Sequence, residues 1–276
     1  MTAATVDVTA GNVYNTRVYR ELRIAVVIPA FNERSKIADT VATVPDFIDD
    51  IIVVDDASRD DTSRQAELAA LGRARPDGVE VIRHTANRGV GAAITTGYRR
   101  ALAIGAEVAV VMAGDGQMDP RDLPALLEPI ARGDADYVKG NRFLHPEIWT
   151  AMPTSRIVGN VVLSAATRLT SGYRHVFDSQ CGYTAIHRGA LAVIALADLF
   201  PRYGYPNDLL SRLHVAEMRV VDVPVRPIYG AHWRSGINVG TALHPIPWVL
   251  LRSWGNRVAA QVRRRVQSRT GRIAPV

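Results

Sequence analysis

Cysteine, lysine and long apolar runs are all scarce in this chain of 276 residues. The single cysteine, Cys181, excludes an internal disulfide and favours a reducing compartment. No apolar run reaches the roughly 18 residues that a membrane-spanning helix needs. Residues 1–20 lack the basic start and apolar core of a signal peptide, and we expect them to form a flexible leader. The predicted location is cytoplasmic, with peripheral contact to the inner face of the cell membrane.

Lysine occurs only at Lys36 and Lys139, so arginine carries almost all of the net charge of +6. The planar guanidinium fork matches the oxygens of phosphate, and anionic ligands are therefore expected. A basic stripe interleaved with aromatic residues is missing, so nucleic acid is not an expected partner. The apolar content of 47% is enough for a sizeable core.

Short β-branched runs alternate with helical patterns in the first half of the chain. The predicted strands cover 24–28, 51–54, 79–82 and 108–112, and the predicted helices 35–43, 61–71 and 91–104. This alternation predicts an α/β protein with a Rossmann-like, mostly parallel sheet flanked by helices. Such sheets bind ligands at the carboxyl ends of their strands, where this sequence places the polar turns PAFNER, DDASRDDTS and AGDGQMDP.

The second half is less regular. Further strands are predicted at 137–143, 181–186 and 218–225, and further helices at 155–169 and 207–215.

Two of the polar turns contain candidate ligand-binding carboxylates. Asp115 follows a buried strand in a glycine-rich turn, and with Gln117 it suits a hard cation such as Mg²⁺ or Mn²⁺, although a solvent-exposed turn is the alternative. Asp56 could accept hydrogen bonds from a nucleobase or ribose, or it could belong to an ordinary capped turn. The glycine-rich helix start beside Arg88 could accept phosphate, or its glycines could allow close packing.

Together, four motifs resemble the family 2 glycosyltransferases, particularly the dolichyl- or polyprenyl-phosphate sugar synthases: VVIPAFNE, IIVVDDASRDDT, NRGVGAA and GDGQMDP. The resemblance is specific over residues 24–142 and looser to about residue 238. It implies a GT-A fold, a UDP- or GDP-hexose donor, a divalent metal and inversion at the anomeric carbon. It also implies a catalytic domain over 21–240, with a nucleotide-sugar half over about 21–142 and an acceptor half over about 143–240.

The resemblance assigns donor-side roles to residues of the first half. Those that match the nucleotide-binding first loop are Pro29, Phe31, Asn32 and Glu33. Asp56 matches the acid that contacts the base or ribose, and Arg88 lies beside it in the donor-side set. Asp115 and Gln117 match metal-associated positions of an Asp-x-Asp-x-Gln stretch whose first Asp is Ala113 here. One carboxylate fewer implies a weaker metal site, or one that depends more on the diphosphate.

Three arginines match positions associated with an acceptor phosphate: Arg142, Arg156 and Arg234. Taken singly, each would more simply be a solvated surface charge. The segment Asp178–Ile186 matches the family's Asp-x-x-x-Gly-aromatic segment.

The catalytic residues expected on this resemblance are Asp115, Arg234 and Asp208. The metal and the arginines would neutralise charge on the leaving diphosphate. Asp208 is a candidate base, with a helix cap as the alternative. The expected activity is hexose transfer to a lipid phosphate. The alternatives are transfer to a sugar or small-molecule hydroxyl, and a sugar-nucleotide-binding protein without catalysis.

The C-terminal segment 241–276 is predicted to contain a basic amphipathic helix over 248–266. Helical spacing gathers six apolar residues on one side: Trp248, Leu251, Trp254, Val258, Val262 and Val266. Arginines lie mainly around the rest of the helix. The helix would either pack on the domain or lie in a membrane interface, to which its arginines would add attraction.

Overall fold

A computed structural model describes residues 21–229 and 246–270. Predictions for the other residues, Arg234 and the leader among them, lie outside the described residues. The proposed domain boundaries remain predictions.

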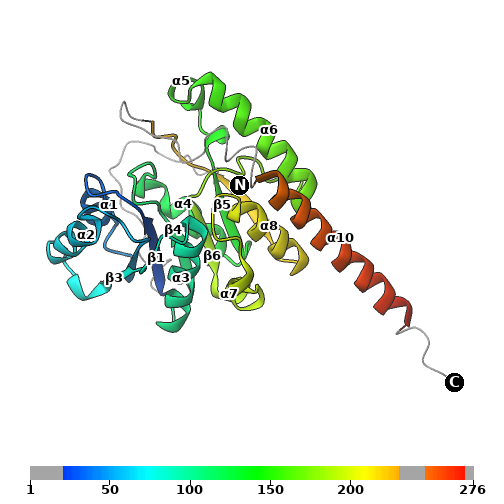
Figure 1. The fold of residues 1–276 in the computed structure, drawn as a ribbon, viewed down its shortest axis with the longest axis horizontal. Coiled ribbons are helices and arrows are strands. Elements are labelled where there is room, and N and C mark those ends of the chain that lie inside the picture. Colours follow the sequence, from blue (N-terminus) through cyan, green and yellow to red (C-terminus); the bar gives the residue numbers. More distant parts are fainter. Residues whose placement is uncertain (1–20, 230–245, 271–276) are drawn as a thin grey trace, which may run out of the picture.

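A seven-stranded sheet in the order β3-β2-β1-β4-β6-β5-β7 forms the middle of the molecule (Figure 1). Its strands are β1 (Ile24–Ala30), β2 (Asp50–Asp55), β3 (Val79–Arg83), β4 (Val108–Val111), β5 (Tyr137–Asn141), β6 (Thr184–His187) and β7 (Val220–Pro224). Strand β6 runs antiparallel to its neighbours β4 and β5, and every other pairing in the sheet is parallel. The predicted mostly parallel sheet is confirmed, and all seven predicted strands are present with shifted ends.

Helices cover both faces of this sheet (Figure 1). Those of four residues or more are α1 (Ile37–Thr43), α2 (Thr62–Leu71), α3 (Val90–Ala103), α4 (Leu123–Ala131), α5 (Ile148–Ala151), α6 (Thr154–Ser171), α7 (Arg188–Val193), α8 (Tyr205–Val215) and α10 (Ile246–Thr270). The predicted helices of both halves are confirmed. The short helices α5 and α7 were not predicted.

Strand β1 shows why the central strands are apolar without alternation. All seven of its residues are buried, because Val26 and Ile28 pack into the core on one face and Val27 into the core on the other. Helix α3 lies very close to this strand: a Cβ at Gly97 would be only 2.1 Å from Cγ1 of Val27. The sheet thus gives a rigid base for the loops that follow its strands.

Helix α10 packs on the domain through a different face from the predicted apolar stripe. It buries Ile246, Val249 and Ser253 against α8 and α6. Four residues of the predicted stripe are exposed: Trp248 (50%), Leu251 (66%), Trp254 (50%) and Val262 (53%). Both alternatives for this helix therefore have a structural basis.

Within the described residues, no helix combines the length and apolar character needed to cross a bilayer.

Candidate functional site

A central cavity of about 540 Å³ lies at the carboxyl ends of β1, β2, β4 and β5. Most of the predicted site residues among those described line it: Pro29, Phe31, Glu33, Asp56, Asp115, Gln117, Arg142 and Arg156. Asn32, Arg88 and Asp208 do not. A separate cavity of about 690 Å³ between α7, α8 and α10 contains none of the predicted residues. The central cavity is therefore the candidate active site.

Asp56 organises the turn that begins α3. Its buried carboxylate accepts hydrogen bonds from the backbone N–H groups of Arg88 (2.8 Å) and Gly89 (2.6 Å) and from Nδ1 of His84 (2.7 Å). The Arg88 contact thus uses the backbone, and its side chain does not line the cavity. Asp56 thus has a structural role, which is to hold the backbone of the turn at residues 88–89. Its contact with a base or ribose remains a prediction.

Asn32 acts within the first loop. Its backbone is left-handed (φ 57°), a conformation that asparagine tolerates better than most residues. Its Oδ1 accepts from the backbone N of Arg59 (2.8 Å), and its own N–H donates to Oγ of Ser58 (2.9 Å). These bonds fasten the loop after β1 to the loop after β2, so that Phe31 and Glu33 can line the cavity.

Asp115 and Glu33 bring two carboxylates to one side of the cavity. Burial raises the pKa of Asp115, and its carboxylate accepts from the backbone N of Gln117 (3.0 Å). Burial raises the pKa of Glu33 as well, and the negative charge of Asp115 adds to that shift. Within the described chain neither acid forms an ion pair.

These residues could bind a divalent cation that takes its other oxygen ligands from a diphosphate. The positive charge of Lys36 opposes the rise in the pKa of both acids without forming an ion pair with either. The two carboxylates and the Gln117 amide are oxygen donors of the type that Mg²⁺ and Mn²⁺ prefer. No group of three or more His, Cys, Asp or Glu residues could hold a metal within residues 21–229 and 246–270. A cation bound to Glu33, Asp115 and Gln117 would have room for further oxygen ligands from a diphosphate, in line with Ala113 in place of the family's first Asp.

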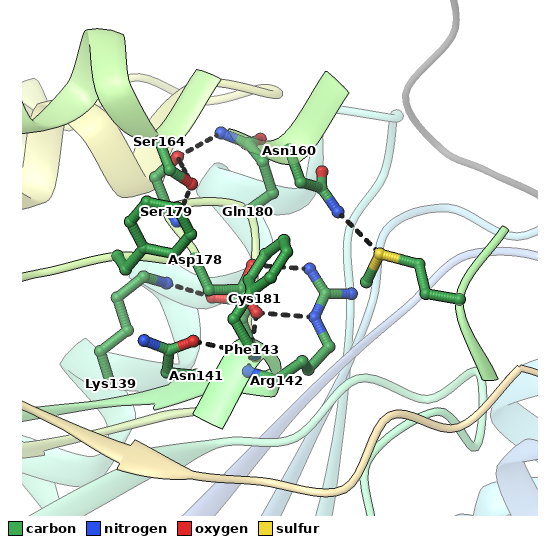
Figure 2. A network of polar contacts seen from close by, with 12 residues as sticks. Lys139, Asn141, Arg142, Phe143, Asn160, Ser164, Asp178, Ser179, Gln180 and Cys181 are labelled. Carbon is green, nitrogen blue, oxygen red and sulfur yellow. Dashed lines mark hydrogen bonds and ion pairs between the residues drawn. The ribbon is translucent and has the colours of Figure 1, made fainter. Parts of the chain in front are cut away.

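Arg142 lines the cavity and is held there by a buried polar network (Figure 2). Its Nε and Nη2 each donate to Asp178 at 2.8 Å, and its Nη1 donates to the Tyr229 hydroxyl at 2.9 Å. Burial raises the pKa of Asp178, but the positive charge of Arg142 and its hydrogen bonds outweigh burial and leave that pKa lowered. The guanidinium of Arg142 is therefore fixed in orientation, as recognition of an anion requires.

Lys139 lies deeper in the same network and is fully buried. Its Nζ donates to the backbone oxygen of Cys181 (Figure 2). Burial lowers the pKa of Lys139, while the nearby charges of Asp178 and Asp222 oppose that change. Lys139 and Arg142 are thus balanced by the two carboxylates of Asp178 and Asp222, so this network holds Arg142 in place without a large excess of charge.

Arg156 reaches the cavity from the first turn of α6, and Asn160 lines it one turn later. Burial lowers the pKa of Arg156, and the positive charge of Arg142 contributes to this shift. The two predicted acceptor arginines are therefore near one another on one side of the cavity. Their partner in the prediction, Arg234, lies outside the described residues.

The candidate base Asp208 is the predicted residue whose position differs most from expectation. It is 1% exposed, and it pairs with Arg212 (3.1 Å) and Arg252 (3.2 Å) instead of lining the cavity. Its Oδ2 also accepts from the backbone N of Phe200 (3.0 Å). The alternative of a helix cap is not realised either, because the acid sits within the first turn of α8 and forms no cap hydrogen bond.

Comparison with known proteins identifies the family. The family description "Glycosyl transferase family 2" matches residues 25–194, more than half of the chain. This chain belongs to glycosyl transferase family 2. The match begins in β1 and ends beyond β6, so it contains the loops that carry Glu33, Asp56, Asp115 and Arg142.

Relatives of this family 2 glycosyltransferase include proteins whose names state an activity. UDP-N-acetylglucosamine–dolichyl-phosphate N-acetylglucosaminyltransferase of Methanococcus voltae is 34% identical over 216 residues, which cover 75% of this chain and 86% of the relative. Undecaprenyl-phosphate mannosyltransferase of Micrococcus luteus is 32% identical over 240 residues, which cover 84% of this chain and 96% of the relative.

A solved structure confirms the fold class. Glucosyl-3-phosphoglycerate synthase from Mycobacterium tuberculosis, in complex with Mn²⁺, UDP-glucose and phosphoglyceric acid, superimposes with a TM-score of 0.64. The alignment covers 87% of this chain and 82% of the synthase, at 22% sequence identity. The predicted GT-A architecture is therefore confirmed for this glycosyltransferase.

Several cavity residues were not predicted from the sequence. Arg202 and Tyr203 line it from the loop before α8, and Arg226 from the segment after β7. Arg226 pairs with Asp119 at 2.5 Å, and burial of Asp119 is outweighed by its bonds to Arg121 and Arg226, which lower its pKa to about 2. These residues lie in loops without a family-like motif, so only the fold brings them to the site.

Proposed function

We propose that this family 2 glycosyltransferase moves a hexose, with inversion, from a nucleotide diphosphate sugar to a polyprenyl phosphate. The observation that carries the proposal is the division of one cavity into two sides: Asp115 and Glu33 on one, Arg142 and Arg156 on the other. The first side suits a cation with a diphosphate, and the second suits a separate phosphate. The names of the two relatives support this pairing of a sugar donor with a lipid phosphate.

The proposed donor is a UDP- or GDP-hexose, and the name of the Methanococcus relative favours uridine. Asp115, Gln117 and Glu33 would hold a Mg²⁺ or Mn²⁺ ion, which neutralises charge on the diphosphate when it is bound. Phe31 is 43% exposed at the cavity, so its ring is available to stack on a base. Asp56 holds the turn at residues 88–89 beside that position.

In the proposed reaction, Arg142 and Arg156 hold the acceptor phosphate in line with the anomeric carbon. A phosphate oxygen forms the new bond to that carbon while the bond to the nucleoside diphosphate breaks on the opposite face, which inverts the configuration. The phosphate is already ionised at neutral pH and needs no general base. The position of Asp208 outside the cavity agrees with this, whereas a hydroxyl acceptor would have to lose a proton.

A lipid acceptor requires the enzyme to reach a membrane surface, and α6 is suited to this. Helix α6 exposes an apolar stripe that begins two residues after Arg156: Val158 (59%), Val161 (38%), Val162 (61%) and Leu169 (75%). Trp149 on α5 is 70% exposed. Helix α10 packs on α6 and adds its own outward stripe, with the exposed Arg263 on the same helix.

We propose that these exposed stripes make peripheral contact with a cytoplasmic membrane surface. Figure 1 shows α6 and α10 at the end of the molecule away from α2 and β3. The apolar side chains would enter the interface while arginines approach anionic lipid headgroups. An acceptor phosphate could then reach Arg156 while its prenyl chain stays in lipid.

The decisive experiment incubates the protein with Mn²⁺, undecaprenyl phosphate in detergent and one labelled sugar nucleotide at a time. We expect label in the organic phase with at least one UDP- or GDP-hexose, and none when undecaprenol replaces its phosphate. Label transferred to undecaprenol or to a sugar hydroxyl would favour the hydroxyl alternative. Nucleotide binding without turnover of any donor would favour the binding-protein alternative.

A further inference from the structure

The loop Leu199–Gly204, before α8, forms part of the cavity wall beside the two carboxylates. Arg202, Tyr203 and Gly204 line the cavity. Burial raises the pKa of Tyr203, and the negative charges of Asp115 and Glu33 add to the shift, so the hydroxyl lies within electrostatic reach of both acids. This loop therefore borders the side of the cavity that we assign to the donor.

One side of the loop packs on the turn that Asp56 organises. The backbone N of Ala92 donates to the backbone oxygen of Pro201 at 2.9 Å. The two segments are so close that a Cβ at Gly91 would lie 2.3 Å from the oxygen of Phe200, and one at Gly89 would lie 2.6 Å from the oxygen of Pro201. A displacement of the loop would therefore disturb the N-terminus of α3.

The other side of the loop is held by Asp208 and two arginines. Oδ2 of Asp208 accepts from the backbone N of Phe200 at 3.0 Å. Arg212 and Arg252 both pair with this carboxylate, and both also donate to the backbone oxygen of Asp198, at 2.7 and 3.2 Å respectively. We call these five residues the Asp208 clamp: Asp198, Phe200, Asp208, Arg212 and Arg252.

The clamp connects the loop to the C-terminal helix. Arg252 is a residue of α10, and its guanidinium lies 5.4 Å from the ring centroid of Trp248, whose ring is 6.2 Å from that of Phe200. Val249 of α10 contacts the position of Gly204, where a Cβ would meet it at 3.2 Å. Helix α10 thus supports the loop at both of its ends.

We infer that Asp208 and Arg252 are positioning residues for the donor, which hold loop 199–204 against the N-terminus of α3 and so complete the donor side of the cavity. The inference rests on the proposed function, because it assumes that a nucleotide diphosphate sugar binds beside Asp115. It gives α10 a second role: besides facing outward with its apolar stripe, the helix sets the affinity for the donor. It also explains why Asp208 is buried and paired instead of facing the acceptor.

The test compares two arginine variants of α10. In Arg252→Gln, the clamp loses one ion pair while Arg212 still neutralises Asp208. We expect the dissociation constant for UDP or GDP with Mn²⁺, measured by calorimetry, to rise about fivefold or more. We expect the donor KM to rise in parallel, with kcat and the KM for undecaprenyl phosphate within about twofold of the parent.

The matched control is Arg257→Gln. Arg257 lies on the same helix and donates to the backbone oxygen of Leu169 in α6 at 3.0 Å, away from the loop. This variant should leave nucleotide affinity unchanged. An equal rise in both variants would refute the inference, because it would show that only general docking of α10 matters. Unchanged nucleotide affinity in a folded Arg252→Gln protein would refute it as well.

Asp208→Asn separates positioning from proton transfer. On our inference it raises the donor KM but leaves the shape of the pH profile of kcat unchanged. A large fall in kcat, with loss of one limb of that profile, would show that Asp208 is a base after all. If Asp208→Asn does not fold, the arginine pair decides. Failure of the parent protein to bind any nucleotide diphosphate would instead refute the proposed function.

Discussion

The two halves of the molecule use charge and apolar surface in opposite ways. In the first half, residues 21–142, the acids Glu33, Asp56 and Asp115 face the cavity from strand ends. In the second half, the charged residues that line the cavity are Arg156, Arg202 and Arg226, and Arg142 lies at the boundary between the halves. Among the described residues, the exposed large apolar side chains of the first half are Phe31, Leu68 and Leu71, and all others belong to the second half. The difference agrees with the proposed function, in which the donor meets mainly the acids of the first half and the lipid acceptor meets the exposed apolar surface of the second.

The largest expected effect concerns the acidic side of the cavity. Asp115→Ala should abolish Mn²⁺-dependent binding of nucleotide diphosphate and lower kcat/KM at least about 100-fold, because the leaving group loses its charge compensation. Calorimetry with and without Mn²⁺ measures the loss. Asp39→Ala, at an acid of α1 outside the cavity, is the control. Undiminished Mn²⁺-dependent affinity in Asp115→Ala would mean that other residues hold the metal.

The next effect concerns the basic side. Arg156→Ala should raise the KM for undecaprenyl phosphate about 10-fold to 100-fold, since hydrogen bonds between charged groups contribute about 1.5–3 kcal/mol. Donor affinity should not change. Arg168→Ala, near the other end of α6, serves as control. A rise in the donor KM instead would indicate that Arg156 binds the donor, and it would contradict the proposed division of the cavity into a donor side and an acceptor side.

Two leucines of similar exposure, one in each half, test whether the exposed apolar surface of the second half binds a membrane. Leu169 on α6 is 75% exposed, and Leu71 on α2 is 73% exposed. Leu169→Glu should weaken co-sedimentation with anionic vesicles severalfold, because a charge replaces an apolar side chain at the interface. Leu71→Glu should have no effect. Equal behaviour of the two variants, or a parent protein that ignores anionic vesicles at low salt, would contradict the proposed membrane contact.

The smallest expected effect restores the missing acid. Ala113 lines the cavity, so Ala113→Asp should lower the Mn²⁺ concentration needed for half-maximal activity a few-fold, as an added carboxylate strengthens a hard-cation site. A titration of activity against Mn²⁺ measures the change, and Ala113→Asn controls for side-chain size. An unaltered midpoint would mean that residue 113 does not face the cation.

Prediction from the sequence was most accurate where the local pattern of apolar and polar residues matches their burial in the fold. Strand β1 is apolar throughout because it is buried on both faces, and the polar turn at Asp115 follows directly from the end of β4. These features predicted the sheet and its ligand edge. The family resemblance then predicted Arg142 and Arg156, which the structure brings near one another.

Other features depend on packing between distant segments. Helical spacing found the apolar stripe of α10 but could not show which face meets α8, because Ile246, Val249 and Ser253 form an equally regular set. Asp208 was proposed as a base because local sequence does not reveal Arg252, which is 44 residues away. Arg202 and Arg226 reach the cavity through tertiary structure alone.

The reversed strand β6 has a consequence for how such an enzyme can diversify. Because β5 and β6 are antiparallel neighbours, the chain leaves the sheet after Asn141 and re-enters it at Thr184 on the same edge. The segment between the two strands, which includes Arg142, Arg156 and Asp178, therefore begins and ends at the same edge of the sheet. A segment with both ends at one edge can change in length and sequence without altering the order of the strands. On the proposed function, the acceptor side of the cavity could therefore vary while the strands that carry the donor side stay the same.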